Sequence, residues 1–125
     1  MSESRRLLGQ RGEKLAESYL VNKGLRIVDR NVRTKRGEID LIALDGTCMV
    51  FVEVRTRSSQ MFGTAAESIT WKKKQKLREL AIEYLHQASQ PVPSFRFDVI
   101  AIFTGTSRGD EDLMKPVIEH YESAF

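Results

Sequence analysis

The sequence predicts an α/β fold in which helices flank a mixed β-sheet. Apolar residues recur with helical spacing in two segments, and four other segments have strand character. Along the chain they follow one another as helix, three strands, helix and strand, over residues 9–23, 25–32, 38–44, 47–55, 70–88 and 95–103. A hairpin enclosed by helices is typical of a mixed sheet with helices on its faces.

The length and composition predict one globular domain over residues 1–125. Hydrophobic residues make up 41% of the chain and charged residues 30%, which is typical of a folded rather than a disordered protein. No apolar run approaches the ~20 residues of a membrane span, so no membrane partner is expected. Cys48 is the only cysteine and residues 1–10 lack the apolar stretch of a secretory signal, so a cytoplasmic location is expected.

The first helix is predicted by small and apolar residues at helical spacing, namely Gly12, Leu15, Ala16, Tyr19 and Leu20. Gly24 is well placed to end it. Glu13 lies seven residues before Leu20, so its side chain projects near the buried stripe. An acid near a helix N-terminus also interacts favourably with the helix dipole, so position alone leaves both roles open for Glu13.

The second and third strands are predicted to form a hairpin around Asp45-Gly46, the strongest short hairpin signal. A two-residue turn at these positions pairs Leu44 with Thr47. One face of the hairpin is then continuous core, formed by Ile39, Leu41, Ala43, Val50, Val52 and Val54. A slip of one residue would reverse the faces.

The other face of the same hairpin gathers charged side chains, because residues two apart share a face. Glu38 is expected opposite Glu53, with Asp40 diagonal to Glu53 and Arg55 beside them. Like charges that face one another destabilise a sheet, so three acids require compensation. Arg55 can neutralise one, and Mg²⁺ can bind two carboxylates while it keeps several waters. The alternative is a solvated face with surface ion pairs.

The remaining segments are read from local signals. Leu25, Ile27 and Val28 are expected to face inward from the first strand, and residues 56–68 are expected to form a loop. Thr70 is a candidate N-cap for the second helix. Residues 117–121 are expected to form a last short strand. Asp98, on the fourth strand, is either an acid that supports the carboxylate site or an ordinary strand residue.

Basic residues cluster in two places. One cluster opens the second helix, at Lys72, Lys73, Lys74, Lys76 and Arg78, and the other is Arg30, Arg33, Lys35 and Arg36. Cations at a helix N-terminus oppose the helix dipole, which favours a role in contacting phosphates over a role in helix stability. An ordinary solvated face is the alternative. Trp71, beside the first cluster, could stack on a base or cap the core.

The charge distribution also favours a polyanionic partner. The last 17 residues hold five acidic residues and one lysine, so the first 108 carry more than the net charge of +3. A basic body of this kind suits nucleic acid or acidic lipid, or serves solubility alone.

Several motifs closely resemble the YraN family, a bacterial family of uncharacterised proteins. The resemblance rests on Gly12-Glu13 with Ala16 and Tyr19-Leu20, on Arg36-Gly37-Glu38-Ile39-Asp40-Leu41-Ile42, on Val50-Phe51-Val52-Glu53-Val54-Arg55-Thr56-Arg57, and on Arg96-Phe97-Asp98-Val99-Ile100-Ala101. It covers nearly the whole chain. The family in turn resembles the PD-(D/E)XK endonuclease superfamily and archaeal Holliday-junction resolvases.

This resemblance implies a restriction-endonuclease-like αβββαβ core, in agreement with the predicted element order. It implies that Asp40 and Glu53 hold Mg²⁺ (or Mn²⁺), with the backbone carbonyl of Val54 as a further ligand and Glu13 as a more distant catalytic acid. The superfamily pattern has lysine two residues after the glutamate, where this chain has Arg55. Arginine can stabilise charge, but it cannot act as a base.

The sequence therefore predicts a metal-dependent DNA endonuclease, acting on branched or structured DNA, with Asp40, Glu53, Arg55 and Glu13 as its catalytic residues. The expected nucleic-acid contacts are Arg33, Arg36, Arg57, Lys72, Lys73, Lys74 and Lys76. A DNA-binding module with weak or no catalysis is the first alternative, supported by Arg55. A protein-interaction subunit that forms a homodimer is the second.

Overall fold

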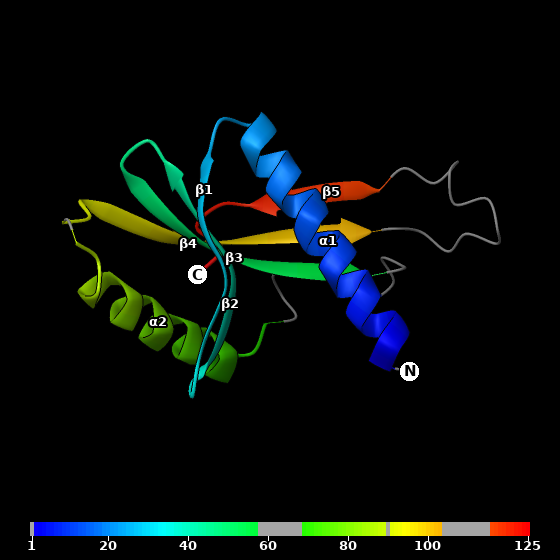
Figure 1. Cartoon of the computed structure of the whole chain (residues 1–125), viewed down its shortest axis with the longest axis horizontal. Coiled ribbons are helices and arrows are strands. Elements are labelled where there is room, and N and C mark those ends of the chain that lie inside the picture. The colour runs from blue at the N-terminus through cyan, green and yellow to red at the C-terminus, as the bar shows by residue number, and fades with distance from the viewer. Residues whose placement is uncertain (1, 58–68, 90, 104–115) are drawn as a thin grey trace.

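The computed structural model describes residues 2–57, 69–89, 91–103 and 116–125, apart from the side chains of residues 2–6 and 8 (Figure 1). Its elements in chain order are α1 (Ser2–Asn22), β1 (Arg26–Thr34), β2 (Gly37–Asp45), β3 (Cys48–Arg57), α2 (Trp71–His86), β4 (Ser94–Phe103) and β5 (Val117–Tyr121). The five strands form one sheet in the order β1-β2-β3-β4-β5. Only β3 and β4 are parallel. The predicted mixed sheet with two flanking helices and an αβββαβ order is confirmed.

The two helices pack on opposite faces of the sheet, and each covers its own core. The α1 side buries Ala16, Leu20 and Leu25 against Leu41, Ala43, Val50, Val52, Ile100 and Ile102. The α2 side buries Leu77, Leu80 and Ala81 against Ile39, Ile42, Met49, Phe51 and Phe97. Successive side chains along β2, β3 and β4 point to opposite faces of the sheet, so the same strands contribute residues to both cores.

The packing of α1 on β3 depends on a glycine. A Cβ atom at Gly12 would collide with the Oγ1 atom of Thr56, so only glycine allows the helix to approach this closely. Gly24 follows the helix with a φ of 103°, and the N–H of Leu25 bonds to the carbonyl of Leu20 at 3.0 Å. The predicted end of the helix is therefore confirmed, while its start lies earlier than the predicted residue 9.

The hairpin between β2 and β3 turns one residue later than predicted. Asp45 pairs with Cys48, so the two turn residues are Gly46 and Thr47. Gly46 has a φ of 64° and Thr47 does not have a positive φ, the pattern of a type II′ turn with glycine at its first central position. The predicted pairing of Leu44 with Thr47 and of Glu38 with Glu53 is wrong. The register differs by two residues, so the assignment of side chains to faces is preserved where the strands pair, over residues 41–45 and 48–52.

Two residues predicted to face the α1-side core do not. Ile39 packs in the α2-side core beside Val32, and Val28 is exposed. The pairing of β2 with β3 extends only from Asp45 to Leu41, beyond which β2 pairs with β1 alone. A two-stranded ribbon twists more strongly than a wide sheet, which accounts for the rotation of Ile39 out of the expected face. A register shift between Ile27 and Asp29 likewise interrupts the alternation at Val28.

The second helix and the last strand match their predictions. The Thr70 hydroxyl accepts a hydrogen bond from the N–H of Lys73 at 3.1 Å and caps α2, and β5 spans Val117–Tyr121. Most of the predicted loop, residues 58–68, lies outside the described residues, as do the acidic residues at 110–112. No helix in the described part of the chain is long and apolar enough to cross a membrane.

Candidate metal and nucleic-acid site

Asp40 lies where β2 separates from β3. Its Oδ2 accepts a hydrogen bond from the N–H of Val54 at 2.9 Å, so a side chain replaces the backbone ladder at this point. Burial raises the pKa of the Asp40 carboxyl and the nearby Glu38 carboxylate raises it further, while the Val54 hydrogen bond opposes both effects. The Asp40 carboxyl therefore lies in surroundings that disfavour its charged form.

Glu53 is the second carboxylate of the pair and is only 7% exposed. Burial, together with the charge of Asp40, raises the pKa of Glu53 to about 7. Glu53 follows Phe51 by two residues, so strand alternation places it on the α2 side of β3. Asp40 lies beside Ile39, where the alternation of β2 is interrupted, and its hydrogen bond to Val54 directs its side chain toward β3. The charge of Asp40 raises the pKa of Glu53, which indicates that the two carboxyls are neighbours, and their arrangement on one face stays a prediction.

Two cations compensate the pair. Arg55 Nε lies 3.3 Å from Glu53 Oε2, but its N–H has no hydrogen-bond partner among the described residues. Lys73, from the first turn of α2, lowers the pKa of both Asp40 and Glu53 by its charge. Lys73 is a predicted nucleic-acid contact, and its effect on these acids was not predictable from local pattern because it acts from α2 on two distant strands.

Glu13 brings α1 to the edge of the same cluster. Burial, followed by the charges of Asp40 and Glu38, raises the pKa of Glu13 to about 7. With its amide oriented to donate, the Asn31 nitrogen lies 3.1 Å from Glu13 Oε1 and 2.9 Å from Glu38 Oε2. Asn31 adopts a φ of 49°, a left-handed conformation that asparagine tolerates better than most residues. Asn31 is therefore a bridging residue that the sequence analysis did not assign to the site.

The donor chemistry of this cluster fits a hard divalent cation. The described residues contain no group of three or more Asp, Glu, His or Cys side chains arranged to hold a metal. Mg²⁺ needs fewer, since it is commonly held by one or two carboxylates and keeps its waters. Asp40 and Glu53 supply two desolvated carboxylates that repel one another, and a cation would relieve that repulsion. The Val54 carbonyl as a further ligand stays a prediction.

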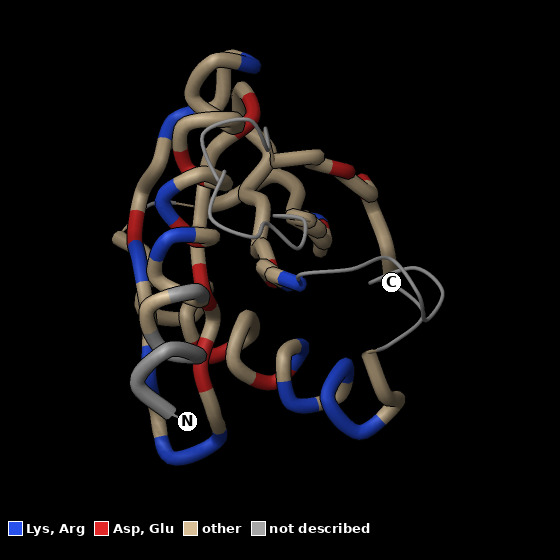
Figure 2. Tube along the Cα trace, turned by 90° about the vertical axis from the view of Figure 1, so that its right-hand side faces the viewer, with Lys and Arg blue, Asp and Glu red and all other residues tan. Residues whose placement is uncertain are grey.

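Some of the predicted phosphate contacts already interact with other side chains of the protein, whereas others are exposed. Arg33 and Arg36 pair with acids, at 3.4 Å to Glu38 and 3.1 Å to Glu79. Lys74 lies 5.6 Å over the ring of Phe125. Lys72 and Lys76 are exposed, and Arg57 is half-buried at the end of β3. Figure 2 shows basic residues crowding the first turns of α2, which leaves Lys72 and Lys76 as the cations most open to a partner there.

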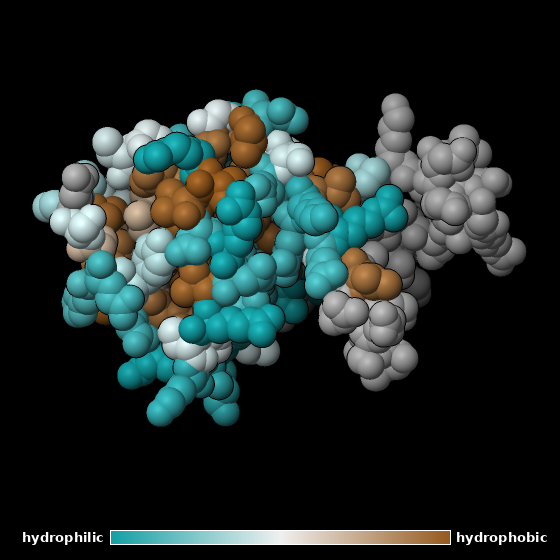
Figure 3. All heavy atoms as spheres, in the orientation of Figure 1, coloured by the Kyte–Doolittle hydropathy of each residue, from teal (hydrophilic) through white to brown (hydrophobic). Residues whose placement is uncertain are grey.

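A groove of about 950 Å³ runs along α1 beside the cluster. Glu13 and Asn31 line it together with the cations Arg11, Lys14 and Arg30. The face that carries α1 is largely hydrophilic, with apolar side chains showing between charged ones (Figure 3). Glu13 therefore connects the carboxylate cluster to a polar groove, in which Arg30 is paired with Glu17 while Arg11 and Lys14 add positive charge.

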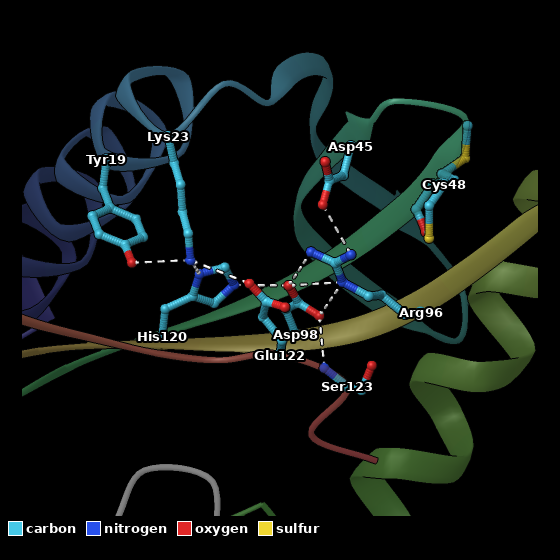
Figure 4. Close-up of polar contacts among 10 residues, drawn as sticks. Tyr19, Lys23, Asp45, Cys48, Arg96, Asp98, His120, Glu122 and Ser123 are labelled. Carbon is cyan, nitrogen blue, oxygen red and sulfur yellow. Dashed lines mark hydrogen bonds and ion pairs between the residues drawn. The ribbon is translucent and has the colours of Figure 1, made fainter.

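A second buried acid lies away from this site. Asp98 is fully buried on the α1 side of β4, level with Ile100. Its carboxylate accepts hydrogen bonds from Arg96 Nε at 3.0 Å, from His120 Nε2 at 2.7 Å and from the N–H of Ser123 at 3.0 Å (Figure 4). Burial alone would raise the pKa of Asp98, but these hydrogen bonds outweigh it and lower the pKa below its usual value. Asp98 is neither an ordinary strand residue nor part of the carboxylate pair.

The chain of contacts continues from His120 to α1. Lys23 Nζ lies 3.0 Å from His120 Nδ1 and 3.2 Å from Glu122 Oε2. Because an ammonium group can only donate, His120 accepts at Nδ1 and carries its proton on Nε2, which donates to Asp98. This network ties α1, β4 and β5 together. The alternation of Asp98 with Phe97 and Val99 was visible in the sequence, but the partners from residues 23, 96, 120 and 123 were not.

Comparison with known proteins gives a consistent assignment. A family model described as "Uncharacterised protein family UPF0102" matches residues 12–102. The UPF0102 protein of Rhodococcus opacus (strain B4) is 45% identical over 118 residues, covering 94% of this chain and 95% of that protein. The UPF0102 protein of Pelotomaculum thermopropionicum is 44% identical over 125 residues, covering all of both chains. The resemblance to the YraN family is confirmed, and the chain belongs to the uncharacterised protein family UPF0102.

Proposed function

We propose that the protein is a Mg²⁺-dependent DNA endonuclease whose metal ligands are Asp40 and Glu53. The observation that carries this proposal is the convergence of two desolvated carboxylates, which raise one another's pKa, beside Lys73 and Arg55. A fold retains such a costly arrangement more readily for function than for stability, since perturbed carboxyl groups concentrate at functional sites.

In this proposal, different residues of the site bind the metal, transfer a proton and stabilise charge. When bound, the divalent cation would supply the positive charge that polarises a phosphodiester and acidifies a water molecule. Arg55 and Lys73 would stabilise negative charge that develops on the phosphate. Glu13, with a pKa of about 7, is suited to accept a proton at neutral pH.

The basic residues would hold the DNA backbone. Lys72, Lys76 and Arg57 offer contacts to phosphates near the site, and the groove along α1 adds Arg11 and Lys14. Such contacts release counterions, so affinity should fall steeply as salt increases. Replacing Lys72 and Lys76 by alanine should weaken binding to all sequences alike. Lys73 is a poor choice for this test because it also compensates Asp40 and Glu53.

A cleavage assay tests the proposal. Wild-type protein is incubated with single-stranded, duplex and branched DNA, with Mg²⁺, with Mn²⁺ and with EDTA. Metal-dependent cutting of at least one substrate is expected, with loss of cutting in Asp40→Asn and Glu53→Gln. Cutting by both variants at the wild-type rate would identify a contaminating nuclease, and no cutting of any substrate by wild type would refute the enzyme.

One observation favours a second function, a DNA-binding module without efficient catalysis. Arg55 stands where the superfamily has lysine, and its Nε faces Glu53 rather than open solvent. An arginine that mainly neutralises Glu53 would leave the site short of a group to stabilise the phosphate. DNA binding that depends on salt, with no cutting under any metal, would support the module over the enzyme.

A further inference from the structure

Trp71 projects into solvent at the start of α2. It is 74% exposed, more than any other large hydrophobic side chain in the described residues. Its backbone is nevertheless held firmly, because Ile69 is buried beside Phe103 and Thr70 caps the helix. The helix packs through Leu77, Leu80 and Ala81, so the indole is not needed for its core. The rival interpretation, in which Trp71 caps the core, is therefore wrong.

The position of Trp71 relates it to the carboxylate pair. Lys73, two residues further along α2, acts by its charge on both Asp40 and Glu53. Lys72, next to the indole, is exposed. An aromatic ring on a capped helix start thus stands within one helical turn of a cation whose charge lowers the pKa of both acids of the candidate metal site.

The surroundings of the ring indicate the chemistry of its partner. A protein partner would need an apolar patch, but the neighbours of Trp71 on α2 are lysines. A flat aromatic ring among cations matches the two parts of a nucleotide, since a base can stack on the ring while lysines hold the phosphates. An unpaired base offers a face for stacking at any position, whereas a duplex exposes base faces only at its two ends because its interior bases are stacked on one another.

We propose that Trp71 stacks on an unpaired base, so that the substrate class of this protein is nucleic acid with a single-stranded segment beside the candidate cleavage site. This proposal rests on the proposed function for the identity of the polymer. It adds a specificity residue that lies outside the metal site and acts on binding rather than on the chemical step.

Trp71 is the only tryptophan in the chain, so its fluorescence reports on this position alone. The full-length protein is titrated in EDTA and low salt with oligothymidine, and separately with a blunt duplex of equal length. Saturable quenching is expected with oligothymidine, and much weaker quenching with the duplex. Fluorescence anisotropy of labelled DNA then gives the affinities of the variants.

The expected loss for Trp71→Ala is at least about fivefold in affinity for oligothymidine, the contribution of stacking on one base. Its affinity for the blunt duplex should stay within about twofold. Trp71→Phe should retain most of the binding because it keeps an aromatic face. Ile82→Ala is the matched control, since Ile82 is 50% exposed on the same helix, and it should bind both DNAs as wild type does.

Three results would overturn the proposal: oligothymidine that binds without quenching, an alanine variant that binds oligothymidine like wild type, or equal losses on both DNAs. These outcomes are separate from the fate of the enzyme proposal because the titration contains no metal. Quenching without cleavage under any condition would retain the stacking role and remove the endonuclease, while cleavage without quenching would do the reverse.

Discussion

The Oδ2 atom of Asp40 and the backbone N–H of Val54 are 2.9 Å apart, across the point where β2 leaves β3. Asp40 therefore has two roles. Its carboxylate supplies negative charge to the candidate metal site, and it accepts a hydrogen bond from a backbone N–H that the main chain of β2 no longer reaches. Substitution of Asp40 by alanine or by asparagine can separate these two roles.

Asp40→Ala should lower the free energy of unfolding by about 1–3 kcal/mol, because it leaves the Val54 N–H without its acceptor. Asp40→Asn should retain most of the stability at pH 8, since its amide oxygen can still accept while the buried charge is removed. Urea denaturation of both variants checks this. Equal destabilisation by the two would show that the charge, not the hydrogen bond, holds this corner of the sheet.

The pH dependence of stability should carry the signature of Glu53. Its pKa rises from 4.5 to about 7 on folding, so the folded state holds the proton more tightly than the unfolded state. Stability should therefore fall as the pH rises from about 4.5 to about 7, by at most about 3 kcal/mol from this group. Glu53→Gln should flatten that slope in urea denaturation at pH 5, 6, 7 and 8. An unchanged slope in the variant would contradict the raised pKa.

Mg²⁺ should stabilise the protein, and more strongly at pH 8 than at pH 5.5. Protons compete with the metal for Asp40 and Glu53, whose pKa values are both raised. Saturation at 100 times Kd corresponds to about 2.7 kcal/mol, or a rise in Tm of several degrees. Differential scanning fluorimetry with Mg²⁺ and after EDTA measures it. A rise that persists in Glu53→Gln would place the metal elsewhere.

Arg55→Lys tests the departure from the superfamily pattern. If Arg55 only compensates Glu53, lysine should cut DNA at least as fast as wild type, and this is the expected result. Arg55→Ala should abolish cutting and leave Glu53 without its neighbouring cation, 3.3 Å away in the wild type. Single-turnover cleavage rates at saturating protein separate these cases. A slower lysine variant would mean that the arginine has taken over charge stabilisation.

The Asp98 network should be essential to stability rather than to catalysis. Asp98→Asn leaves Arg96 and His120 short of their shared anion, and removal of one partner of a buried ion pair costs about 3–5 kcal/mol. Because the pKa of Asp98 is lowered on folding, its contribution is present above about pH 4 and is lost at lower pH. Asp45→Asn is the control: Asp45 bonds the same Arg96 at 3.1 Å but is exposed, so urea denaturation should show a loss of about 1 kcal/mol or less. Similar losses in both variants would contradict this account.

The sequence predicted features that depend on short-range pattern. The order of the elements and the Thr70 cap follow from periodicity and capping signals. The hairpin register did not, since Asp45 remains in the strand and pairs with Cys48, while its side chain bonds to Arg96, 51 residues further along. A shift by two residues preserves faces and changes neighbours within the paired part of the hairpin, so the pairing of Glu38 with Glu53 was wrong, while the shared face of Asp40 and Glu53 stays a prediction.

Features that depend on tertiary contacts were missed. Lys73 was read as a free phosphate contact, although its charge acts on Asp40 and Glu53 from another element. His120 has no assigned role in the sequence analysis, because its partners Asp98 and Lys23 come from β4 and from the residue that follows α1. Asn31 was not assigned to the site either, because its bridging role depends on a left-handed backbone that brings Glu13 and Glu38 within its reach.

The parallel pairing of β3 with β4 has a consequence for the order of folding. The hairpin of β2 and β3 is local and can form early, whereas β4 reaches β3 only after α2 has crossed over. Pairing between distant segments is slow because the entropy cost of closing the loop is incurred before the new contacts stabilise the chain. Glu53 is therefore expected to stay hydrated until β4 docks beside it, so that its desolvation opposes the last steps of folding. The hairpin should form before the carboxylates of the candidate site are buried.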